Sequence, residues 1–283
     1  MTSEYSIRPL IFHYFKESLR QKWLIIFSII FFFLAINIPT LVELSANYLP
    51  PDYLPVYLSY LVSLTFPYLP LLALPMGAIS IVQERESGTL QYILSTRISR
   101  QGYLFAKLSG LTLATTSVLI IGYGIAAIVA YRVSIIHYFV MAEVVFIALL
   151  LNAIMLLLAT LVSILTKRRE TALGIAIALW FLFSVVSSLG QLGIILNTTH
   201  ATPYMVGFTV LDPPESSRIL SVIGTQTEYN ILLTNPSQLG VTGSTLLSVF
   251  GDQAVYILLL TLLVWLVTLA SLCFMVFRRQ DSV

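Results

Sequence analysis

Six apolar runs, each of at least 18 residues, constrain this chain more than any other feature of its sequence. They are Trp23 to Leu41, Tyr53 to Val82, Leu108 to Tyr131, Tyr138 to Leu165, Thr171 to Gly193 and Ala254 to Val276. A run of about 20 apolar residues is long enough to cross a bilayer as a helix. Every backbone amide inside a bilayer needs an internal partner, and the runs lack the alternating pattern of a membrane barrel. The sequence therefore predicts an all-α integral membrane protein with six transmembrane helices.

The composition supports this prediction and narrows the possible chemistry. Hydrophobic residues make up 58% of the 283 residues and charged residues only 10%, whereas soluble domains carry about 25% charged residues. Glu143 is the only charged residue within the six runs. Cys273 is the single cysteine, so the chain has no intrachain disulfide and no cysteine cluster for a metal. We expect residues 1–283 to form one transmembrane domain without a metal site.

The lysines and arginines predict the orientation in the membrane. With the N-terminus inside, 13 of the 15 basic residues face the cytoplasm and only Arg132 and Arg218 face outward. Cytoplasmic flanks of membrane spans are enriched in Lys and Arg. We therefore expect a multi-pass protein of the cell membrane with both termini in the cytoplasm.

Two segments outside the six runs are predicted to lie against the membrane. In residues 5–22, Ile7, Leu10, Tyr14 and their apolar neighbours recur at helical spacing between charged residues, which predicts an interfacial amphipathic helix. Residues 196–253 are too apolar for an exposed loop and contain turn-forming prolines and glycines. This mixture predicts short re-entrant helices on the outer side, before the last run.

The second run is about 30 residues long, or roughly 45 Å as a helix, and so exceeds the hydrocarbon core of about 30 Å. It contains Pro67, Pro70 and Pro75, which lack the backbone N–H that a helix interior uses. We expect a kink around these prolines, which is compatible with a flexing gate and equally with static bending around a neighbouring helix.

The segment at residues 83–103 joins the second and third runs on the cytoplasmic side. Ser87 is a suitable helix cap, and Glu84 and Glu86 bring negative charge to the start of the helix that follows. Leu90, Ile93 and Leu94 share one face of that helix, which suits an apolar knob pressed into a groove of a partner. The alternative is an ordinary loop helix resting on the bilayer, which explains the apolar residues but not the clustered carboxylates.

This segment resembles the ABC-2 family of transporter permeases. The matching residues are an acidic residue, a Gly-Thr-Leu, a short helix ending in Leu-Ser, an Ile-Ser-Arg and a following lysine, here Glu84, Glu86, Gly88, Thr89, Leu90, Ile93, Leu94, Ser95, Ile98, Ser99, Arg100 and Lys107. The resemblance implies that the segment couples the membrane domain to a cytoplasmic ABC ATPase. Thr96 and Arg97 stand where the family often has proline, which leaves the geometry of this turn in question.

A second resemblance concerns the outer segment. Leu211, Asp212, Pro213 and Pro214, followed by Arg218, are similar to a segment of the permease subfamily associated with copper-site maturation of nitrous-oxide reductase. Asp212 stands where asparagine is usual in that subfamily. A proline turn followed by a capped helix is also a common structural device.

The chain lacks the motifs that would make it an enzyme. No phosphate-binding loop of the form G-x-x-x-x-G-K-[ST] occurs, so we expect no cofactor in this chain and assign ATP and Mg to the partner ATPase. We predict a permease subunit that moves an unidentified substrate, with the ATPase, a second permease copy and membrane lipid as partners and no nucleic acid. The alternative is a non-transporting component that couples ATPase strokes to an extracytoplasmic copper-assembly partner.

The predicted orientation is tested by labelling single cysteines in a Cys273→Ser background with a membrane-impermeant thiol reagent. Intact cells should label Gln238→Cys, in the outer segment, and should label Ile98→Cys only after permeabilisation. Labelling of Ile98→Cys from outside intact cells contradicts the topology.

Overall fold

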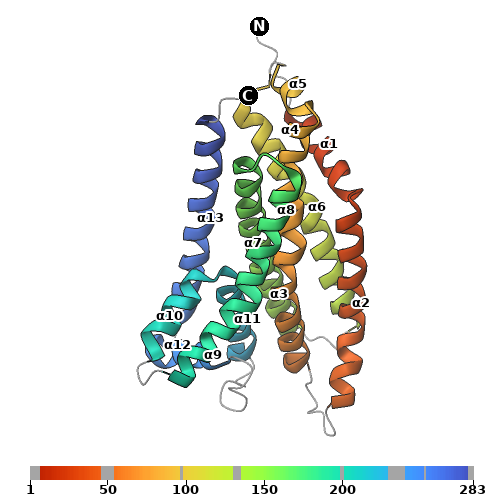
Figure 1. The fold of residues 1–283 in the computed structure, drawn as a ribbon. Coiled ribbons are helices and arrows are strands. Elements are labelled where there is room, and N and C mark those ends of the chain that lie inside the picture. Colours follow the sequence, from red (N-terminus) through yellow and green to blue (C-terminus); the bar gives the residue numbers. More distant parts are fainter. Residues whose placement is uncertain are drawn as a thin grey trace.

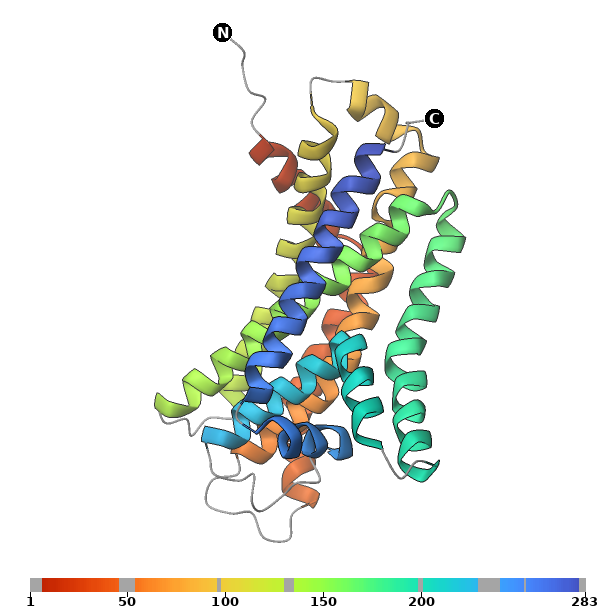
Figure 2. The same ribbon diagram turned by 90° about the vertical axis from the view of Figure 1, so that its left-hand side faces the viewer.

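The computed structural model describes residues 7–45, 54–95, 98–129, 135–197, 201–228, 240–251 and 253–279. These residues are helical apart from short turns, and no strand occurs among them. Figures 1 and 2 show long helices running side by side along one axis, with a group of short helices at one end. The predicted all-α fold is confirmed.

Each of the six apolar runs corresponds to one long helical stretch over most of its length. These stretches are α2 (Lys22–Ser45), α3 (Leu54–Ser80), α6 (Arg100–Val129), α7 (Ile135–Leu165), the continuous run of α8 (Arg169–Phe181), η1 (Leu182–Val186) and α9 (Ser187–Asn197), and α13 (Gln253–Arg279). Within the described residues, five helices are long and apolar enough to cross a membrane, and six if α1 (Ile7–Leu19) and α2, which meet at 64°, form one span. The chain is thus a multi-pass membrane protein.

Helix α1 packs along α6 at very close range. A Cβ atom built on Gly110 of α6 would lie 2.6 Å from the Tyr14 Cβ and 2.9 Å from the Phe15 nitrogen of α1. Only glycine permits the two backbones to approach this closely, since any other residue at position 110 would place a Cβ atom in a clash with α1. The helix predicted within residues 5–22 is present over Ile7–Leu19. Its place at a membrane interface stays a prediction.

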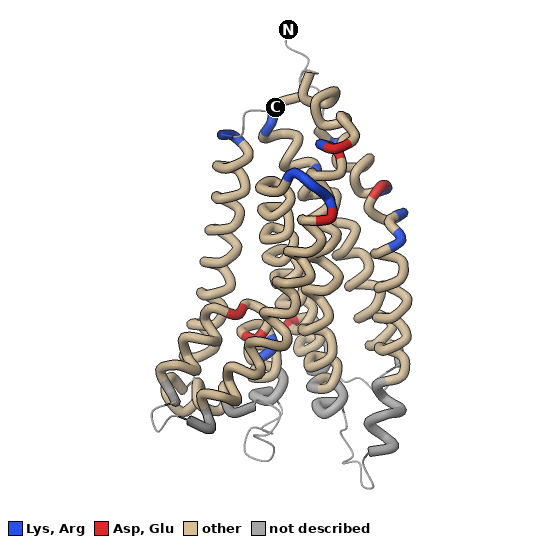
Figure 3. The backbone as a smooth tube through the Cα atoms, viewed as in Figure 1, with Lys and Arg blue, Asp and Glu red and all other residues tan. Residues whose placement is uncertain are grey.

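Charge is distributed unequally between the two ends of the bundle. We call the basic end the one that holds the start of α1, the short helices α4 (Val82–Glu86) and α5 (Thr89–Ser95), and the end of α13 (Figure 3). Nearly all described lysines and arginines lie there, whereas Arg218 lies on α11 (Pro213–Glu228) at the other end. Arg97 and Arg132 lie outside the described residues. The basic residues on which the predicted orientation depends are thus concentrated at one end of the bundle.

The end opposite the basic end is built from short helices. Helices α10 (Ala201–Leu211), α11 and α12 (Gly240–Phe250) gather there with α9 (Figure 1). Helix α11 packs against α3, α7 and α13, and a Cβ on Gly224 of α11 would lie 2.3 Å from the Glu143 Oε1 of α7. The segment predicted at 196–253 thus contains short helices packed into the protein, although their depth in a membrane stays a prediction.

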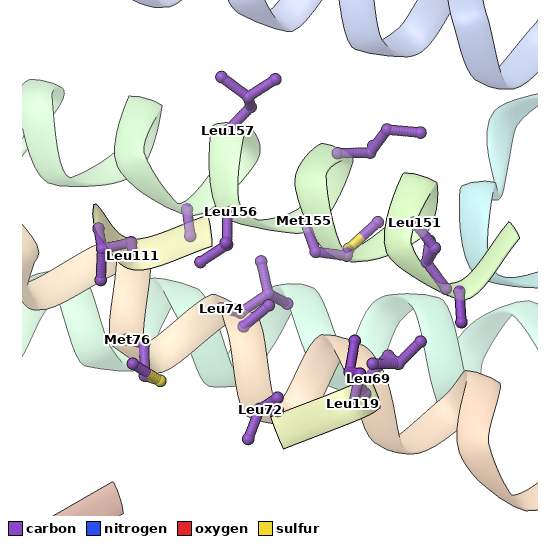
Figure 4. Close-up of a cluster of buried hydrophobic side chains, with 14 of the residues drawn as sticks. Leu69, Leu72, Leu74, Met76, Leu111, Leu119, Leu151, Met155, Leu156 and Leu157 are labelled. Carbon is purple, nitrogen blue, oxygen red and sulfur yellow. The ribbon is translucent and has the colours of Figure 1, made fainter. Parts of the chain in front are cut away.

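The core of the bundle lies between α3, α6 and α7. Figure 4 shows leucine and methionine side chains of these three helices interleaved, among them Leu74, Leu111 and Met155. A Cβ on Gly77 of α3 would lie 2.5 Å from the Ala159 Cβ of α7. Small residues at this crossing let the two helices approach closely, which is how helices gain packing energy in a membrane.

Helix α3 continues through Pro67, Pro70 and Pro75 without interruption. The missing N–H of Pro75 frees the carbonyl of Leu71 four residues earlier, and the Trp23 Nε1 of α2 donates to that oxygen at 3.3 Å. A neighbouring helix thus supplies the hydrogen bond that the proline removes. The expected kink region is part of one continuous helix, and the chain leaves the α3 helix only at Ile81.

The break at Ile81 is stabilised by a side chain from α7. The backbone amides of Ile81 and Val82 both donate to the Ser163 Oγ, at 3.0 and 2.9 Å. Ser163 is fully buried, so water does not offer these amides another partner. One hydroxyl therefore determines where α3 ends and α4 begins.

We predict that Ser163→Ala destabilises the protein by about 2 to 4 kcal/mol, because it leaves two buried N–H groups without an acceptor. Ser117→Ala is the matched control, since this exposed serine donates only to a carbonyl of its own helix. Thermal unfolding in detergent, followed by helical circular dichroism, measures both variants. Equal midpoints for the two would show that the Ser163 contact does not hold the break.

Candidate coupling site

Helix α4 is only five residues long and is bounded by two breaks in the helical path. It follows the break at Ile81 and ends at Glu86, two residues before Gly88, whose φ of 74° lies in the left-handed region that favours glycine. The Ser87 hydroxyl donates to the Glu84 carbonyl at 3.2 Å and lies 2.8 Å from the Thr89 Oγ1. Ser87, predicted to start the next helix, therefore closes α4 and touches the first residue of α5.

Glu84 turns inward from α4 and forms a buried ion pair with Lys107 of α6. Only 8% of Glu84 and 3% of Lys107 are exposed. The second carboxylate oxygen accepts a hydrogen bond of 2.6 Å from the Tyr103 hydroxyl. Both oxygens of the carboxylate thus have partners on α6, so this end of α4 is tied to α6 just before the third apolar run. The sequence predicted that Glu84 places its charge beside the start of α5, whereas its carboxylate points to α6 instead.

Lys107 extends the cluster to α1, and Tyr103 extends it to α13. The Lys107 Nζ lies 3.5 Å from the Glu17 Oε2 and 4.0 Å from the centre of the Tyr14 ring, an arrangement that favours a cation. The Tyr103 ring stacks on Phe277 with 5.8 Å between centres. Helices α1, α4 and α6 therefore meet around one buried ammonium group, and α13 joins this cluster through the Tyr103 ring.

Arg85, the next residue of α4, binds the end of α7. Its Nη1 donates to the carbonyl oxygens of Thr166 and Ile164, at 2.7 and 3.2 Å. The last carbonyls of a helix lack intrahelical partners and carry partial negative charge. The guanidinium group supplies both the missing donors and a compensating positive charge.

Glu86, the third consecutive charged residue, binds the start of α8. Its Oε1 accepts the backbone N–H of Arg169 at 2.8 Å. A carboxylate at a helix N-terminus satisfies a free amide and interacts well with the helix dipole. Glu84, Arg85 and Glu86 thus tie one short helix to α6, to α7 and to α8, and we call α4 with these contacts the α4 junction.

Helix α5 turns its apolar face toward its own bundle. Leu90 is buried in the core, and Ile93 and Leu94 are partly buried against it. The predicted three-residue knob for a partner is therefore wrong for Leu90, which contacts its own chain. Helical spacing identifies an apolar face but not the surface against which it packs. Gln91, Tyr92 and Ser95 are exposed instead, and Tyr92 is 75% exposed.

The remaining predicted residues of the segment lie at the start of α6. Ser99 accepts the Gly102 N–H with its Oγ at 3.0 Å, which caps α6. Ile98 packs against the core, Arg100 is the first residue of α6, and Thr89 is exposed on α5. The structure thus brings Glu84 and Lys107 together and places Ser99 and Arg100 beyond the turn at 96–97, which lies outside the described residues.

The second predicted set of residues lies at the opposite end of the bundle. Asp212 caps α11, because its Oδ1 accepts the Glu215 N–H at 3.3 Å, and Pro213 and Pro214 occupy the first helical positions, where no N–H is needed. Arg218 donates to both Glu215 oxygens, at 2.7 and 2.9 Å. The two predicted sets therefore form separate sites.

Four residues at or beside the α4 junction were not predicted from the sequence as site residues. They are Tyr14, Glu17, Arg85 and Tyr103. Tyr103 and Lys107 are four residues apart on one face of a largely apolar helix, and this spacing was a usable signal. The contacts of Arg85 and Glu17 join segments about 80 and 90 residues apart. A single sequence carries no signal for such pairs. Among the described residues, no group of His, Cys, Asp and Glu suits a metal ion.

Comparisons with known proteins cover almost the whole chain. The family model described as ABC-2 family transporter protein matches residues 9–282. A protein from Stutzerimonas stutzeri named "Probable ABC transporter permease protein NosY" is 28% identical over 274 residues, which is 94% of this chain and 95% of the relative. A protein of the same name from Pseudomonas aeruginosa is 28% identical over 215 residues, or 74% of this chain and 78% of the relative.

We predict that Lys107→Met destabilises the protein by about 3 to 5 kcal/mol, because the buried Glu84 carboxylate then lacks its counter-charge. Adding Glu84→Gln to this variant should restore part of the loss, since a neutral amide still accepts the Tyr103 hydrogen bond. Lys167→Met, at an exposed lysine, is the control. Equal unfolding midpoints for Lys107→Met and Lys167→Met would contradict the structural role of the pair.

Proposed function

The chain belongs to the ABC-2 family of transporter proteins, and from this premise we propose that it is an ABC transporter permease subunit driven by ATP hydrolysed in a separate ATPase. The α4 junction is the observation that carries this proposal. Its three consecutive charged residues bind α6, the end of α7 and the start of α8. A force applied to α4 is therefore passed to several membrane-crossing helices at once.

The ATPase docks on the exposed edge of α5 in this proposal. Tyr92 projects from a helix whose other face is packed into the bundle, so a partner that grips this side chain also moves the helix. Tyrosine is enriched among the residues that dominate binding energy at protein interfaces. Gln91 and Ser95 provide a polar rim beside it.

The docking edge determines the orientation of the proposed complex. ATP is hydrolysed in the cytoplasm, so the basic end with α4 and α5 faces the cytoplasm of the cell membrane, and both termini lie on that side. This orientation agrees with the enrichment of Lys and Arg at the same end. The chain itself has no phosphate-binding loop and therefore depends on the ATPase for energy.

Transport in this proposal requires a second permease copy. Large apolar residues line the exposed sides of the fifth helical stretch (α8, η1 and α9) and of α13, among them Ile177, Phe181, Leu260 and Val264. These residues face either lipid or another subunit. Two copies, each with its own ATPase, move a substrate out of the cell along a path at their interface.

The test of the proposed function is ATP hydrolysis by the permease reconstituted in vesicles with the ATPase encoded beside it. Tyr92→Ala should reduce co-purification of the ATPase by about tenfold or more, the effect of losing a buried aromatic anchor. Tyr256→Ala is the matched control, because Tyr256 is 76% exposed but lies on α13, away from α5. The permease alone should hydrolyse no ATP.

If Tyr92→Ala co-purifies with the ATPase and supports hydrolysis as well as the control Tyr256→Ala does, docking at α5 is contradicted. Hydrolysis by the purified permease alone would contradict its dependence on a partner. A complex that hydrolyses ATP only when an extracytoplasmic copper-assembly protein is added would favour the alternative function predicted from the sequence.

A further inference from the structure

Helix α1 packs on the bundle with one face only. Tyr14 and Ser18 are buried, and Leu10, Ile11 and Phe15 are partly buried against the core. Most of the apolar residues whose spacing predicted an interfacial helix therefore contact the protein itself. In the part of the chain that the structure describes, the opposite face of α1 is exposed.

The exposed face of α1 carries basic side chains on either side of one aromatic ring. Its members follow one another at intervals of four residues and are all exposed: Arg8, Phe12, Lys16 and Arg20. Residues four apart are neighbours on a helix surface, and Arg20 extends the last turn of α1, because its N–H donates to the Glu17 carbonyl at 3.2 Å. The Lys16 Nζ lies 4.4 Å from the centre of the Phe12 ring. We call this set the α1 stripe.

The acidic residue of α1 pairs with another helix and not with the stripe. Glu17 is the only acidic residue of α1, and its Oε2 lies 3.5 Å from the Nζ of Lys107 on α6. Among the described residues, no ion pair joins a basic side chain of the stripe to a carboxylate. Lys22, at the start of α2, is exposed too and is the fourth basic residue here. Such a cluster of positive charge attracts an anionic partner.

The position of α1 next to a membrane-crossing helix favours lipid headgroups as that partner. Helix α1 lies at the basic end (Figure 1) and meets α2 at 64°. The first turns of α2 expose Ile25, Ile26 and Ile29, which places the apolar layer of the bilayer directly after α1. Clusters of four or more Lys and Arg beside a membrane span attract anionic lipids. Phe12 and Leu19, which are exposed among the charges, suit the boundary between headgroups and acyl chains.

We propose that the α1 stripe binds the headgroups of anionic phospholipids. The basic side chains of the stripe contact the phosphates, and the Phe12 ring lies beneath them among the first carbons of the acyl chains. The apolar face of α1 stays packed on α6, so the lipid binds the basic face and displaces no protein contact. The inference assigns a lipid class to α1, and it depends neither on the transported substrate nor on where the ATPase docks.

Lipid bound at the stripe is linked to the α4 junction through α6. Helix α1 is fixed to α6 by the close backbone approach at Gly110 and by the contact of Glu17 with Lys107. Lys107 in turn pairs with Glu84 of α4. A lipid that holds α1 at the headgroup layer therefore also sets the depth of the ion pair in the membrane.

The test is native mass spectrometry of the full-length protein in detergent, incubated with an equimolar mixture of phosphatidylglycerol and phosphatidylcholine. These lipids differ in headgroup charge, and the wild type should retain the anionic lipid in preference. The combined variant Arg8→Gln, Lys16→Gln and Arg20→Gln should lose this preference by about tenfold or more, since one basic residue near an anionic surface changes the affinity about fivefold.

The matched control combines Lys167→Gln, Arg278→Gln and Arg279→Gln. It removes the same charge from exposed residues outside α1 and should retain most of the preference. Thermal unfolding gives a second measurement, because phosphatidylglycerol should raise the midpoint of the wild type more than phosphatidylcholine does. This difference should disappear in the stripe variant and remain in the control.

A wild type that binds the two lipids equally, or an equal loss of preference in the stripe variant and the control, would overturn the proposal. If the stripe variant keeps the lipid preference but no longer co-purifies with the ATPase, the stripe is a protein-docking surface and the proposal is also overturned. If the combined variant does not accumulate, Lys16→Gln is compared with Lys167→Gln, and only Lys16→Gln should reduce the preference, by about fivefold.

Discussion

The buried ion pair between Glu84 and Lys107 is the interaction on which the architecture of the basic end depends. Only 8% of Glu84 and 3% of Lys107 are exposed, so each charge depends on a partner close to it. The Tyr103 hydroxyl donates a hydrogen bond to the second carboxylate oxygen of Glu84, and the Tyr14 ring lies beside the Lys107 ammonium group. Moving α4 away from α6 would leave the buried Glu84 carboxylate without its counter-charge. The two helices are therefore expected to move together.

This constraint gives the α4 junction the properties of a transmission element. Helix α4 lies between two breaks, one at Ile81, where Ser163 accepts both free amides, and one at Gly88, with its positive φ. Between the breaks, Arg85 and Glu86 bind the end of α7 and the start of α8. These charged contacts keep α4 attached to its neighbours. In the proposed function, a stroke delivered at α5 reaches the membrane-crossing helices through α4.

The sequence predicted the helices of the fold well, because long apolar runs admit few alternatives inside a membrane. The residues of the Glu84 to Lys107 segment were predicted as one group from local capping and charge patterns, and their coupling role stays a prediction. Their contacts were predicted less well. Leu90 was assigned to a partner and packs in its own core, and Glu84 was assigned to a helix start and forms an ion pair across 23 residues. Such errors arise because periodicity identifies a face, whereas its partner depends on tertiary packing.

The central claim is that the ATPase moves α4 and the start of α8 as one unit. It is tested most directly by spin-label distances between Gln83→Cys and Glu170→Cys, two exposed positions on either side of the Glu86 contact, in a Cys273→Ser background. The complex with its ATPase would be measured without nucleotide and with ATP bound. The account predicts an unchanged distance within one permease, together with a changed distance between the Gln83 labels of the two copies. A distance between positions 83 and 170 that changes with ATP, while the distance between copies stays constant, would contradict it.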